Sequence, residues 1–417
     1  MTVFLYNIFL FLFRVGTRIA ALWNKKAKLW LYGRKDIFEQ LNSELRNQNS
    51  KSIWFHCSSL GEFEQGRPVM EKIKAQYPNF KILITFFSPS GYEIRKNYNN
   101  TDWVFYLPMD SATNAKRFLD IVHPSLVIFV KYDYWYNYLT ECKKRNIPLL
   151  IISALFRKGQ PFFKWYGNFH RKMLSCFTYF FVQDENSESL LKSINIENVL
   201  KAGDTRFDRV AGIAASFQPV EIIEKFCGTS KVLVAGSTWP ADEKIIRKVH
   251  TSFPDIKLIL APHVVNEKHL DKIKKLFPNS IFFSELTTHD SRLMTNKCLI
   301  IDNIGLLSRL YHYATIAYVG GGFNKGIHNT LEAVVYGKPI IFGPEYKKFK
   351  EAVELIKKGS GICVNNSSEL TSIVGLLLKN KEEYELKCKN SFDFVQQRKG
   401  ATDVIINYIQ ENRLLTN

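Results

Sequence analysis

The stretch Ile316–Ala333 reads IAYVGGGFNKGIHNTLEA, and its order of residue types decides the fold. Its first four residues form an apolar run without strict alternation, which is typical of a parallel strand covered on both faces. Three glycines follow and allow a ligand to approach the backbone closely. We expect a short helix to begin near His328 or Asn329. The stretch therefore predicts one strand–loop–helix unit of a doubly wound α/β domain.

Similar apolar runs alternate with helical patterns along the rest of the chain. In the first half, strands are expected at Ser52–Cys57, Lys81–Phe87, Trp103–Leu107, Leu126–Val130, Pro148–Ser153, Tyr179–Val182 and Val199–Ala202. In the second half, they are expected at Lys231–Ala235, Lys257–Ala261, Ser280–Phe283, Cys298–Ile301, Ile316–Val319 and Pro339–Phe342. Helical segments between strands include Arg67–Tyr77, Ala112–Val122 and Asn186–Ser193. Ala211–Pro219 carries no strand pattern and separates two predicted doubly wound domains, whose ligands bind at the carboxyl ends of the strands.

Length and composition agree with two globular domains and exclude several other classes. The 417 residues are 46% hydrophobic and 23% charged, which excludes a disordered chain. Seven cysteines are scattered without a CxxC pair, which excludes a disulfide scaffold and argues against a zinc ribbon. The formal net charge of +18 favours an anionic partner, such as nucleic acid, an acidic membrane or a phosphorylated substrate.

The amino-terminal segment is strongly apolar. Val3–Phe13 reads VFLYNIFLFLF, and basic residues follow it at Lys25, Lys26 and Lys28. A secretory signal has its positive charges before the apolar run, so this order argues against one. We predict that residues 1–24 form a membrane anchor, either a short span or a helix in the interface, with its basic side facing anionic lipid. The alternative is a buried helix of the first domain.

A second stretch, Phe156–Lys172, mixes aromatic with basic residues. This composition suits the headgroup layer of a membrane. It would also suit single-stranded nucleic acid, although no nucleic-acid motif accompanies it. An amphipathic helix with its aromatic residues in the core is the alternative.

Charged residues follow three of the strands expected in the first half. Glu62 falls at the start of the helix after the first strand, where a carboxylate can act as a general base or simply complement the helix dipole. Lys131–Asp133 follows the fourth strand and indicates either a site or a solvated loop. Arg206 follows the last strand. It could bind a phosphate or carboxylate through two hydrogen bonds, or pair with Asp204 or Asp208.

Polar residues also follow the strands of the second half. Gly236–Thr238 leaves backbone N–H groups free for an anion, and His263 ends the next strand. After the glycines, the helix start near Asn329 can hold a phosphate, and Glu332 can accept hydrogen bonds from a ribose diol. Together these features predict a nucleotide-sugar donor site.

Several short motifs occur in order over nearly the whole chain. They are His56 with the S-x-G-E run Ser59–Glu62, Ser88–Gly91, Tyr106–Pro108, Trp135 with Asn137, Gly203–Asp208, Gly236–Thr238, Gly320–Gly322, His328–Ala333 and Phe342–Pro344. In this combination the chain resembles the 3-deoxy-D-manno-octulosonic acid (Kdo) transferases of lipopolysaccharide biosynthesis.

The resemblance implies a GT-B architecture, with two Rossmann-like domains facing a cleft. Residues 25–212 would bind the acceptor, and residues 213–417 would bind the donor, with the C-terminal helix crossing back. The implied reaction is inverting: Kdo moves from CMP-Kdo to the 6′-hydroxyl of a phosphorylated lipid A precursor of the lipid IVA type. The implied location is the inner membrane, with the catalytic domains on the cytoplasmic side.

The resemblance also implies roles for single residues. Glu62 is the catalytic base, and Arg206 stabilises charge in the transition state. Lys131 stands where the family has a catalytic acid, so either Lys131 or Asp133 takes over that role, or the role is dispensable. The positions that match the family's CMP-contacting segments are Pro262, His263, Ile304, Gly305, Leu306, Asn329, Thr330, Leu331 and Glu332. His263 replaces an arginine, which predicts a weaker phosphate contact, and Leu306 replaces an acid, which predicts contact through the backbone.

Other functions stay open. One is a related epimerase or another lipid-linked glycosyltransferase of the same architecture. Another is a donor-binding protein that has lost catalysis, which the change at Lys131 permits. Because the sequence has neither a metal-ligand cluster nor a nucleic-acid motif, we expect no metal, cofactor or nucleic-acid partner.

Overall fold

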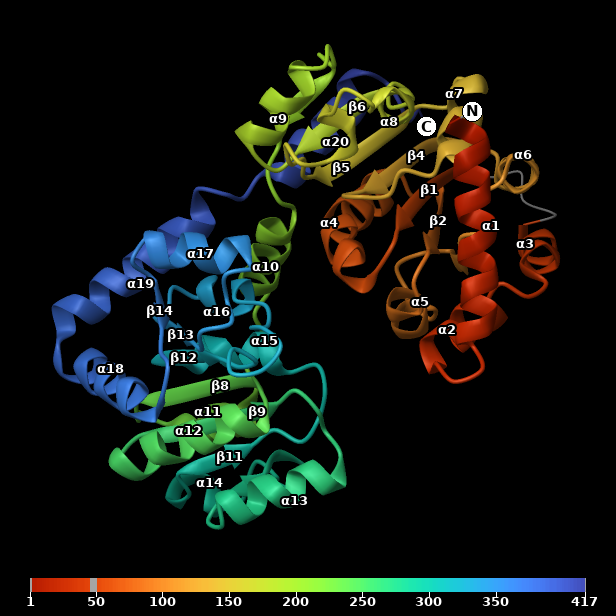
Figure 1. Cartoon of the computed structure of the whole chain (residues 1–417). Coiled ribbons are helices and arrows are strands. Elements are labelled where there is room, and N and C mark those ends of the chain that lie inside the picture. The colour runs from red at the N-terminus through yellow and green to blue at the C-terminus, as the bar shows by residue number, and fades with distance from the viewer. Residues whose placement is uncertain (1, 46–50, 417) are drawn as a thin grey trace. The chain divides into compact units, whose positions relative to one another are not determined.

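A computed structural model describes residues 2–45 and 51–416, and the chain divides into two compact units (Figure 1). Unit 1 comprises residues 1–209 and 399–417, and unit 2 comprises residues 210–398. The boundary lies at 209/210 rather than 212/213, and the last part of the chain belongs to unit 1. Each unit is built on a parallel sheet, which confirms the predicted α/β class with two doubly wound domains.

The sheet of unit 1 has seven parallel strands in the order β3-β2-β1-β4-β5-β6-β7. They are β1 Ser52–Cys57, β2 Lys81–Phe86, β3 Trp103–Tyr106, β4 Pro124–Val130, β5 Leu149–Ala154, β6 Tyr179–Val182 and β7 Val199–Lys201, all of them expected from the sequence. The strand order reverses between β1 and β4. Glu62 and Lys131 follow these two strands, and this reversal is where α/β sheets bind ligands.

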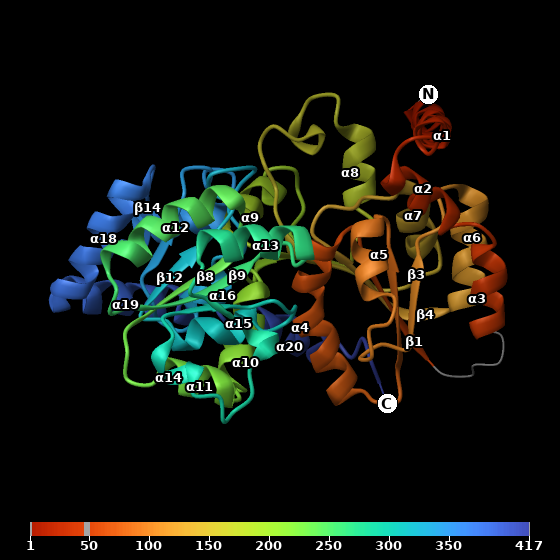
Figure 2. The same cartoon turned by 90° about the horizontal axis from the view of Figure 1, so that it is seen from below.

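Helices cover both faces of this sheet. α3 and α6 lie side by side on one face, and α4 and α20 lie on the other (Figure 2). The C-terminal helix α20 completes unit 1. It buries Ile405, Ile406 and Ile409 in the core on the face of the sheet that α4 covers. The helices of unit 1 are α1 Thr2–Ala20, α2 Lys25–Tyr32, α3 Ile37–Leu45, α4 Leu60–Gln76, α5 Pro89–Arg95, α6 Ala112–Val122, α7 Tyr136–Lys144, η1 Pro161–Phe163, α8 Asn168–Leu174, α9 Glu185–Lys192, α10 Arg206–Ala215, which continues into unit 2, and α20 Ala401–Glu411.

The sheet of unit 2 also has seven parallel strands, in the order β10-β11-β9-β8-β12-β13-β14. They are β8 Val232–Thr238, β9 Lys257–Pro262, β10 Ile281–Phe282, β11 Cys298–Ile300, β12 Ile316–Val319, β13 Ile340–Phe342 and β14 Gly361–Cys363. The helices are α11 Glu221–Cys227, α12 Pro240–Ser252, α13 Glu267–Leu276, η2 Phe283–Glu285, α14 Arg292–Thr295, α15 Leu307–Leu310, η3 Tyr311–Tyr313, α16 Leu331–Val334, α17 Lys350–Lys357, α18 Ser367–Lys379 and α19 Lys381–Gln396.

Three features of unit 2 differ from expectation. The edge strand β14 was not predicted, because it has three residues and starts with glycine, a poor strand former. The expected break at Ala211–Pro219 is helical as far as Ala215, since its alanines favour continuation of α10. The helix expected near His328 begins only at Leu331, because the His328 N–H donates to the Gly320 carbonyl, 3.1 Å away, and holds the preceding segment as a loop.

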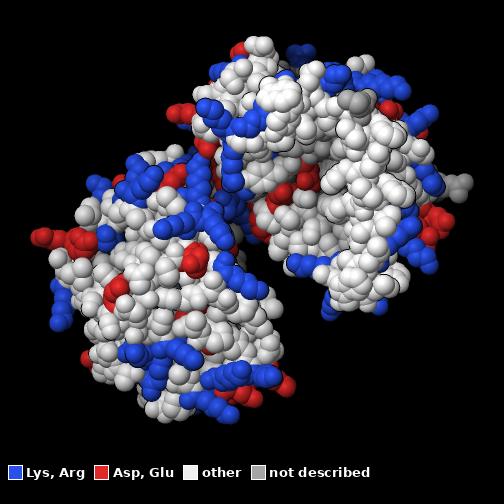
Figure 3. Space-filling view, viewed as in Figure 1, with Lys and Arg blue, Asp and Glu red and all other residues white. Residues whose placement is uncertain are grey.

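The amino-terminal helix α1 lies along unit 1 with most of its side chains exposed. Leu10 is its one buried residue among those described, so the alternative of a buried helix is wrong. The helix is nevertheless attached to the unit: Tyr6 Oη donates to Asp110 Oδ2 at 2.7 Å, and the Phe13 ring packs edge-on against Trp30. By length and composition α1 could cross a membrane. In Figure 3 the surface formed by α1 is mostly uncharged, and Lys and Arg side chains lie along its edges.

The stretch Phe156–Lys172 has some of its aromatic residues in the core and others exposed to solvent. Phe156 and Phe162 are buried in the core of unit 1. Trp165 is 92% exposed and Tyr166 is also exposed, beside Lys164 in the chain. The aromatic residues therefore divide between a core anchor and an exposed tip, which has the composition of a membrane-interface segment.

Candidate active site

Glu62 is the third residue of α4, which begins shortly after β1. Its Oε2 accepts a hydrogen bond from the backbone N–H of Ser58, and the residue is 8% exposed. Backbone N–H groups and the positive end of the helix dipole both stabilise an acid in this first turn. The expected position of Glu62 at the start of the helix is therefore confirmed.

The surroundings of Glu62 raise its pKa to about 8. Burial contributes most, and the negative charge of Asp133 adds to it. The Ser58 N–H and the positive charge of Lys131 act in the opposite direction. A carboxylate with a pKa close to the working pH is well suited to accept a proton and hold it during a reaction.

Asp133 is held in place by a buried histidine. His56 lies inside β1 without exposed surface, and its Nε2 is 2.8 Å from Asp133 Oδ2. Its Nδ1 is 2.8 Å from the Thr85 hydroxyl on β2, and Trp135 Nε1 donates to Asp133 Oδ2 at 3.2 Å. Three neighbouring strands thus fix one carboxylate close enough to influence the pKa of Glu62.

Lys131 comes directly after β4 in an unusual backbone conformation, with φ at 71°. Its N–H donates to the Ile152 carbonyl at 3.0 Å, which keeps the turn attached to the sheet. The ammonium group lies 4.9 Å from the centroid of the Tyr132 ring. Because its charge lowers the pKa of Glu62, Lys131 belongs to the electrostatic surroundings of that acid.

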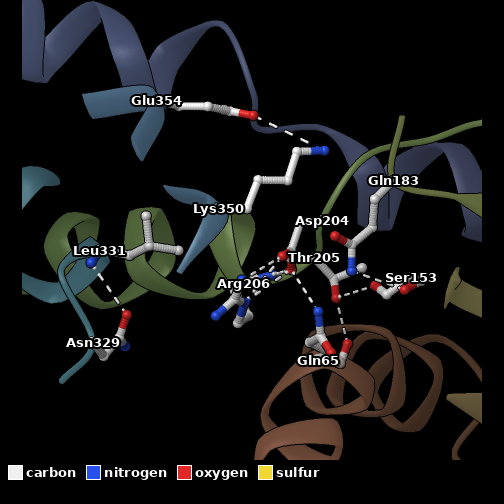
Figure 4. A network of polar contacts seen from close by, with 10 residues as sticks. All are labelled: Gln65, Ser153, Gln183, Asp204, Thr205, Arg206, Asn329, Leu331, Lys350 and Glu354. Atoms are coloured by element: carbon white, nitrogen blue, oxygen red, sulfur yellow. Dashed lines mark hydrogen bonds and ion pairs between the residues drawn. The ribbon is translucent and has the colours of Figure 1, made fainter. Parts of the chain in front are cut away.

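Arg206, at the start of α10, forms a two-point ion pair with Asp204 (Figure 4). Its Nε is 3.0 Å and its Nη2 2.8 Å from Asp204 Oδ2. Gln65 Nε2 donates to Asp204 Oδ1 at 3.1 Å, which connects the pair to α4 three residues beyond Glu62. Burial raises the pKa of Asp204, but the charge and hydrogen bonds of Arg206 lower it below its ordinary value. Asp208, the other expected partner, instead accepts hydrogen bonds from backbone N–H groups of Gly400 and Thr402.

In unit 2, three aromatic rings stack at the carboxyl ends of the strands. The His263 ring lies 4.1 Å from the His328 ring and 5.0 Å from the Trp239 ring, centroid to centroid. Trp239 Nε1 donates to His328 Nε2 at 3.0 Å. Burial, followed by the neighbouring His263, lowers the pKa of His328 to about 4, so this ring is neutral at physiological pH.

The glycine loop after β12 allows two backbone segments to approach each other. A side-chain carbon at Gly320 would lie 2.4 Å from the Ser237 carbonyl oxygen, and one at Gly322 would lie 2.6 Å from the Gly343 backbone. Asp242 secures the loop by accepting hydrogen bonds from the Gly321 N–H at 3.0 Å and from the Tyr318 hydroxyl at 2.7 Å. The glycines at these two positions are therefore required by packing between loops, in addition to any approach of a ligand.

Comparisons with known proteins show which family the chain is similar to. Residues 34–209 match the family model described as 3-deoxy-D-manno-octulosonic-acid transferase (kdotransferase). A 3-deoxy-D-manno-octulosonic acid transferase from Aquifex aeolicus is 28% identical over 348 residues, which cover 81% of this chain and 89% of the relative. One from Rickettsia felis is 25% identical over 371 residues, which cover 86% of this chain and 78% of the relative. Residues 34–209 therefore match the Kdo transferase family, and the similarity to its members extends over most of the chain.

The similarity of structure extends beyond this family. The chain superimposes on a UDP-GlcNAc 2-epimerase from Neisseria meningitidis with a TM-score of 0.60 and 16% identity, over 86% of this chain and 100% of the other. At this level of identity the likeness concerns the fold alone. It agrees with a GT-B-like fold, in which this chain has two doubly wound units.

The positions predicted to contact the donor fall into three environments in unit 2. Pro262 is the last residue of β9, and His263 belongs to the ring stack. Asn329 Nδ2 donates to Glu332 Oε1 at 3.0 Å, whereas Thr330 and Leu331 between them are buried. The other three positions are Ile304, Gly305 and Leu306, which form the loop before α15, where Ile304 is 90% exposed and Gly305 has φ at 107°. Of the predicted donor residues, the geometry thus joins Asn329 with Glu332 and with Leu331, whose backbone N–H donates to Asn329 Oδ1 at 3.1 Å (Figure 4).

Two parts of the candidate site were not predicted from the sequence. The contact between His56 and Asp133 joins residues 77 positions apart, so the sequence offers only a histidine inside an apolar strand as a signal of a buried partner. Trp239 follows Gly236–Thr238 at once, but nothing in its neighbourhood indicates that it stacks with histidines. Within residues 2–45 and 51–416, no three His, Cys, Asp or Glu side chains form a group that could hold a metal ion.

Proposed function

We propose that this protein moves Kdo from CMP-Kdo to the 6′-hydroxyl of a phosphorylated lipid A precursor, with inversion at the anomeric carbon. The observation that carries the proposal is the buried Glu62 carboxyl at the start of α4, with a pKa near 8, inside the segment that matches the family model. The charged groups near it are Lys131 and Asp133 after β4 and the pair of Asp204 with Arg206 after β7, and they are suited to proton transfer and anion binding.

In the proposed reaction Glu62 takes the proton of the acceptor hydroxyl while the oxygen attacks the anomeric carbon of Kdo. The bond from that carbon to the CMP phosphate oxygen breaks, and CMP leaves with its electron pair. The positive charge of Lys131 lowers the pKa of Glu62, so a larger fraction of this carboxyl is ionised and able to accept the proton. Arg206, fixed by Asp204, stabilises negative charge that develops on the leaving phosphate or on the Kdo carboxylate.

Unit 2 is proposed to bind CMP-Kdo. Its neutral stack of His263, His328 and Trp239 offers flat faces for a pyrimidine base. Glu332 would accept hydrogen bonds from the ribose diol, and its hydrogen bond with Asn329 orients its carboxylate. The phosphate would be bound by backbone N–H groups of the loops after β8 and β12.

Unit 1 is proposed to bind the acceptor at the cytoplasmic face of the inner membrane. The exposed apolar face of α1 supports insertion into the hydrocarbon boundary, and basic residues along its edges support contact with anionic headgroups. The exposed tip at Trp165 supplies a second interfacial contact.

The reaction is tested by mass spectrometry of a tetraacylated, bisphosphorylated lipid A precursor after incubation with the purified protein, CTP, Kdo and a CMP-Kdo synthetase. Addition of one or more Kdo units is the expected result. The stereochemistry is read from the anomeric configuration of the product by NMR. No addition, in a reaction where a known Kdo transferase works on the same materials, would contradict the proposal.

A further inference from the structure

Unit 1 contains a cavity that is lined in part by Asp133, a neighbour of the proposed base. A cavity of about 530 Å³ lies between α1, the loop after β4 and the segment from η1 to α8. This volume falls within the range of about 300–1,000 Å³ that is usual for small-molecule sites. Its walls include Leu5, Phe9, Asp133, Trp135, Tyr166 and Phe169.

The wall formed by α1 is apolar and held in place. The bond from Tyr6 to Asp110 and the contact of the Tyr6 ring with Phe169, 5.7 Å apart, fix the helix against the unit at this point. Leu5 and Phe9 are nevertheless more than half exposed, so the cavity is open along α1. Among the residues that the structure describes, α1 is the one helix with the length and composition of a membrane span. With α1 inserted into the membrane as proposed, a molecule that enters past this helix comes from the apolar part of the membrane.

The opposite wall reaches the base. Asp133 lines the cavity, and its negative charge also raises the pKa of Glu62. Since His56 and Trp135 hold the Asp133 carboxylate, the end of the cavity has a fixed position relative to α4. A ligand with an apolar chain in the cavity would have its polar part directed toward the loop that carries Lys131–Asp133.

We propose that this cavity binds one acyl chain of the acceptor lipid and thereby selects acceptors by their acylation. The inference rests on the proposed function, because the acceptor is taken to be an acylated sugar. Burial of the chain between α1 and α8 would position the sugar hydroxyl for Glu62, so part of the binding energy of the lipid is used for orientation.

The test compares two phenylalanines on the same helix. Phe9 lines the cavity and is 59% exposed, whereas Phe11 is 65% exposed and does not line it. Phe9→Glu and Phe11→Glu place the same charge two residues apart in the chain, on different faces of α1. We expect Phe9→Glu to lower the ratio of kcat/KM for tetraacylated over acyl-free acceptor about tenfold, the loss expected if two methylene groups are no longer buried. We expect Phe11→Glu to leave this ratio within about twofold of wild type.

A second pair, Leu5→Trp and Leu12→Trp, keeps the helix apolar. Leu5 lines the cavity and Leu12 does not, and both leucines are exposed. We expect only Leu5→Trp to lower the ratio, because an indole at position 5 would occupy the space of the chain. Equal effects within either pair would overturn the proposal and leave membrane contact as the sole role of this face.

A readout independent of transfer separates this proposal from the proposed function. A tetraacylated precursor with a diazirine in one acyl chain is photolysed with the full-length protein in membranes, and labelled peptides are identified by mass spectrometry. We expect labels on the α1 and α8 peptides that line the cavity, and their loss in Phe9→Glu but not in Phe11→Glu. Equal labelling by a diazirine phospholipid would overturn the assignment to the acceptor. Labelling as expected without Kdo transfer by wild type would retain the cavity and refute the proposed function.

Discussion

The two units place opposite kinds of chemistry at the same place in the fold. At the carboxyl edge of its sheet, unit 1 has the buried acids Glu62 and Asp204, with the partly buried Asp133 and Arg206 beside them. At the corresponding edge, unit 2 has neutral rings and glycines. A doubly wound sheet thus fixes where a ligand binds and leaves the chemistry to the loops. In unit 1 the surroundings raise the pKa of Glu62 toward the working pH, whereas in unit 2 burial lowers the pKa of His263 and His328 and favours their neutral forms.

The largest expected effect comes from the base. Glu62→Gln keeps the size of the side chain but cannot accept the proton, so we expect kcat to fall about 10²–10⁴-fold. Donor binding, measured by calorimetry with CMP, should stay within about twofold because the change lies in unit 1. A variant that keeps more than a tenth of the wild-type rate would show that another group is the base.

The stability of the same variant checks that its fold is intact. The folded pKa of Glu62, about 8, lies above the model-compound value of 4.5, so between these two values the folded state binds a proton that the unfolded state has released. The free energy of unfolding of the wild type therefore falls as the pH rises through this window. Since glutamine does not titrate, Glu62→Gln should gain stability relative to wild type over the same window. Urea titrations at pH 5 and pH 8 measure the difference.

The next largest effect concerns the ion pair of Asp204 and Arg206. Asp204 is 8% exposed and loses its two-point partner in Arg206→Ala. We expect a loss of about 1–3 kcal/mol in unfolding free energy, since the buried carboxylate loses its charged partner and keeps only the Gln65 side chain and the backbone N–H of residue 206 as donors. Arg206→Lys should recover part of the stability but not the two parallel bonds. If Arg206→Ala is as stable as wild type and as active, the pair has neither the structural nor the catalytic role.

A smaller effect is expected on the pH dependence of kcat/KM. Asp133 raises the pKa of Glu62 and Lys131 lowers it. Asp133→Asn should therefore shift the rising limb of kcat/KM to lower pH, and Lys131→Ala should shift it to higher pH. Opposite shifts measured in the same buffers would show that both charges act through Glu62. Shifts in the same direction would mean that the limb reports a different group.

The sequence predicted the scaffold better than the contacts within the site. Strands such as Tyr179–Val182 and Ile316–Val319 were located to the residue, because a buried parallel strand is a continuous apolar run bounded by polar residues. Glu62 was placed correctly at its helix start, since strand, turn and helix follow each other directly in the chain. Local order of residues was sufficient for both.

Long-range pairings were not predictable in the same way. Nothing in the sequence near His56 indicates that Asp133 is its partner, and the choice of Arg206 between Asp204 and Asp208 depended on where α20 begins. The start of α16 was placed too early because the bond from His328 to Gly320 crosses the loop and competes with helix formation. In each case a contact between distant segments decided the local geometry.

The smallest expected effect concerns CMP binding to unit 2, because we expect the affinity for CMP to be nearly independent of pH. Between pH 7 and pH 8.5 the phosphate of CMP keeps its charge, and His328, with a pKa near 4, stays neutral. Burial also lowers the pKa of His263. CMP affinity should thus change less than about twofold over this range, while the rate that depends on Glu62 rises. Calorimetry in buffers of different ionisation enthalpy should give no net proton uptake on binding. Uptake of a proton would mean that a histidine of the stack becomes protonated when the phosphate binds. Unit 2 would then also change the protonation of a buried group during its function, and the contrast between the units would disappear.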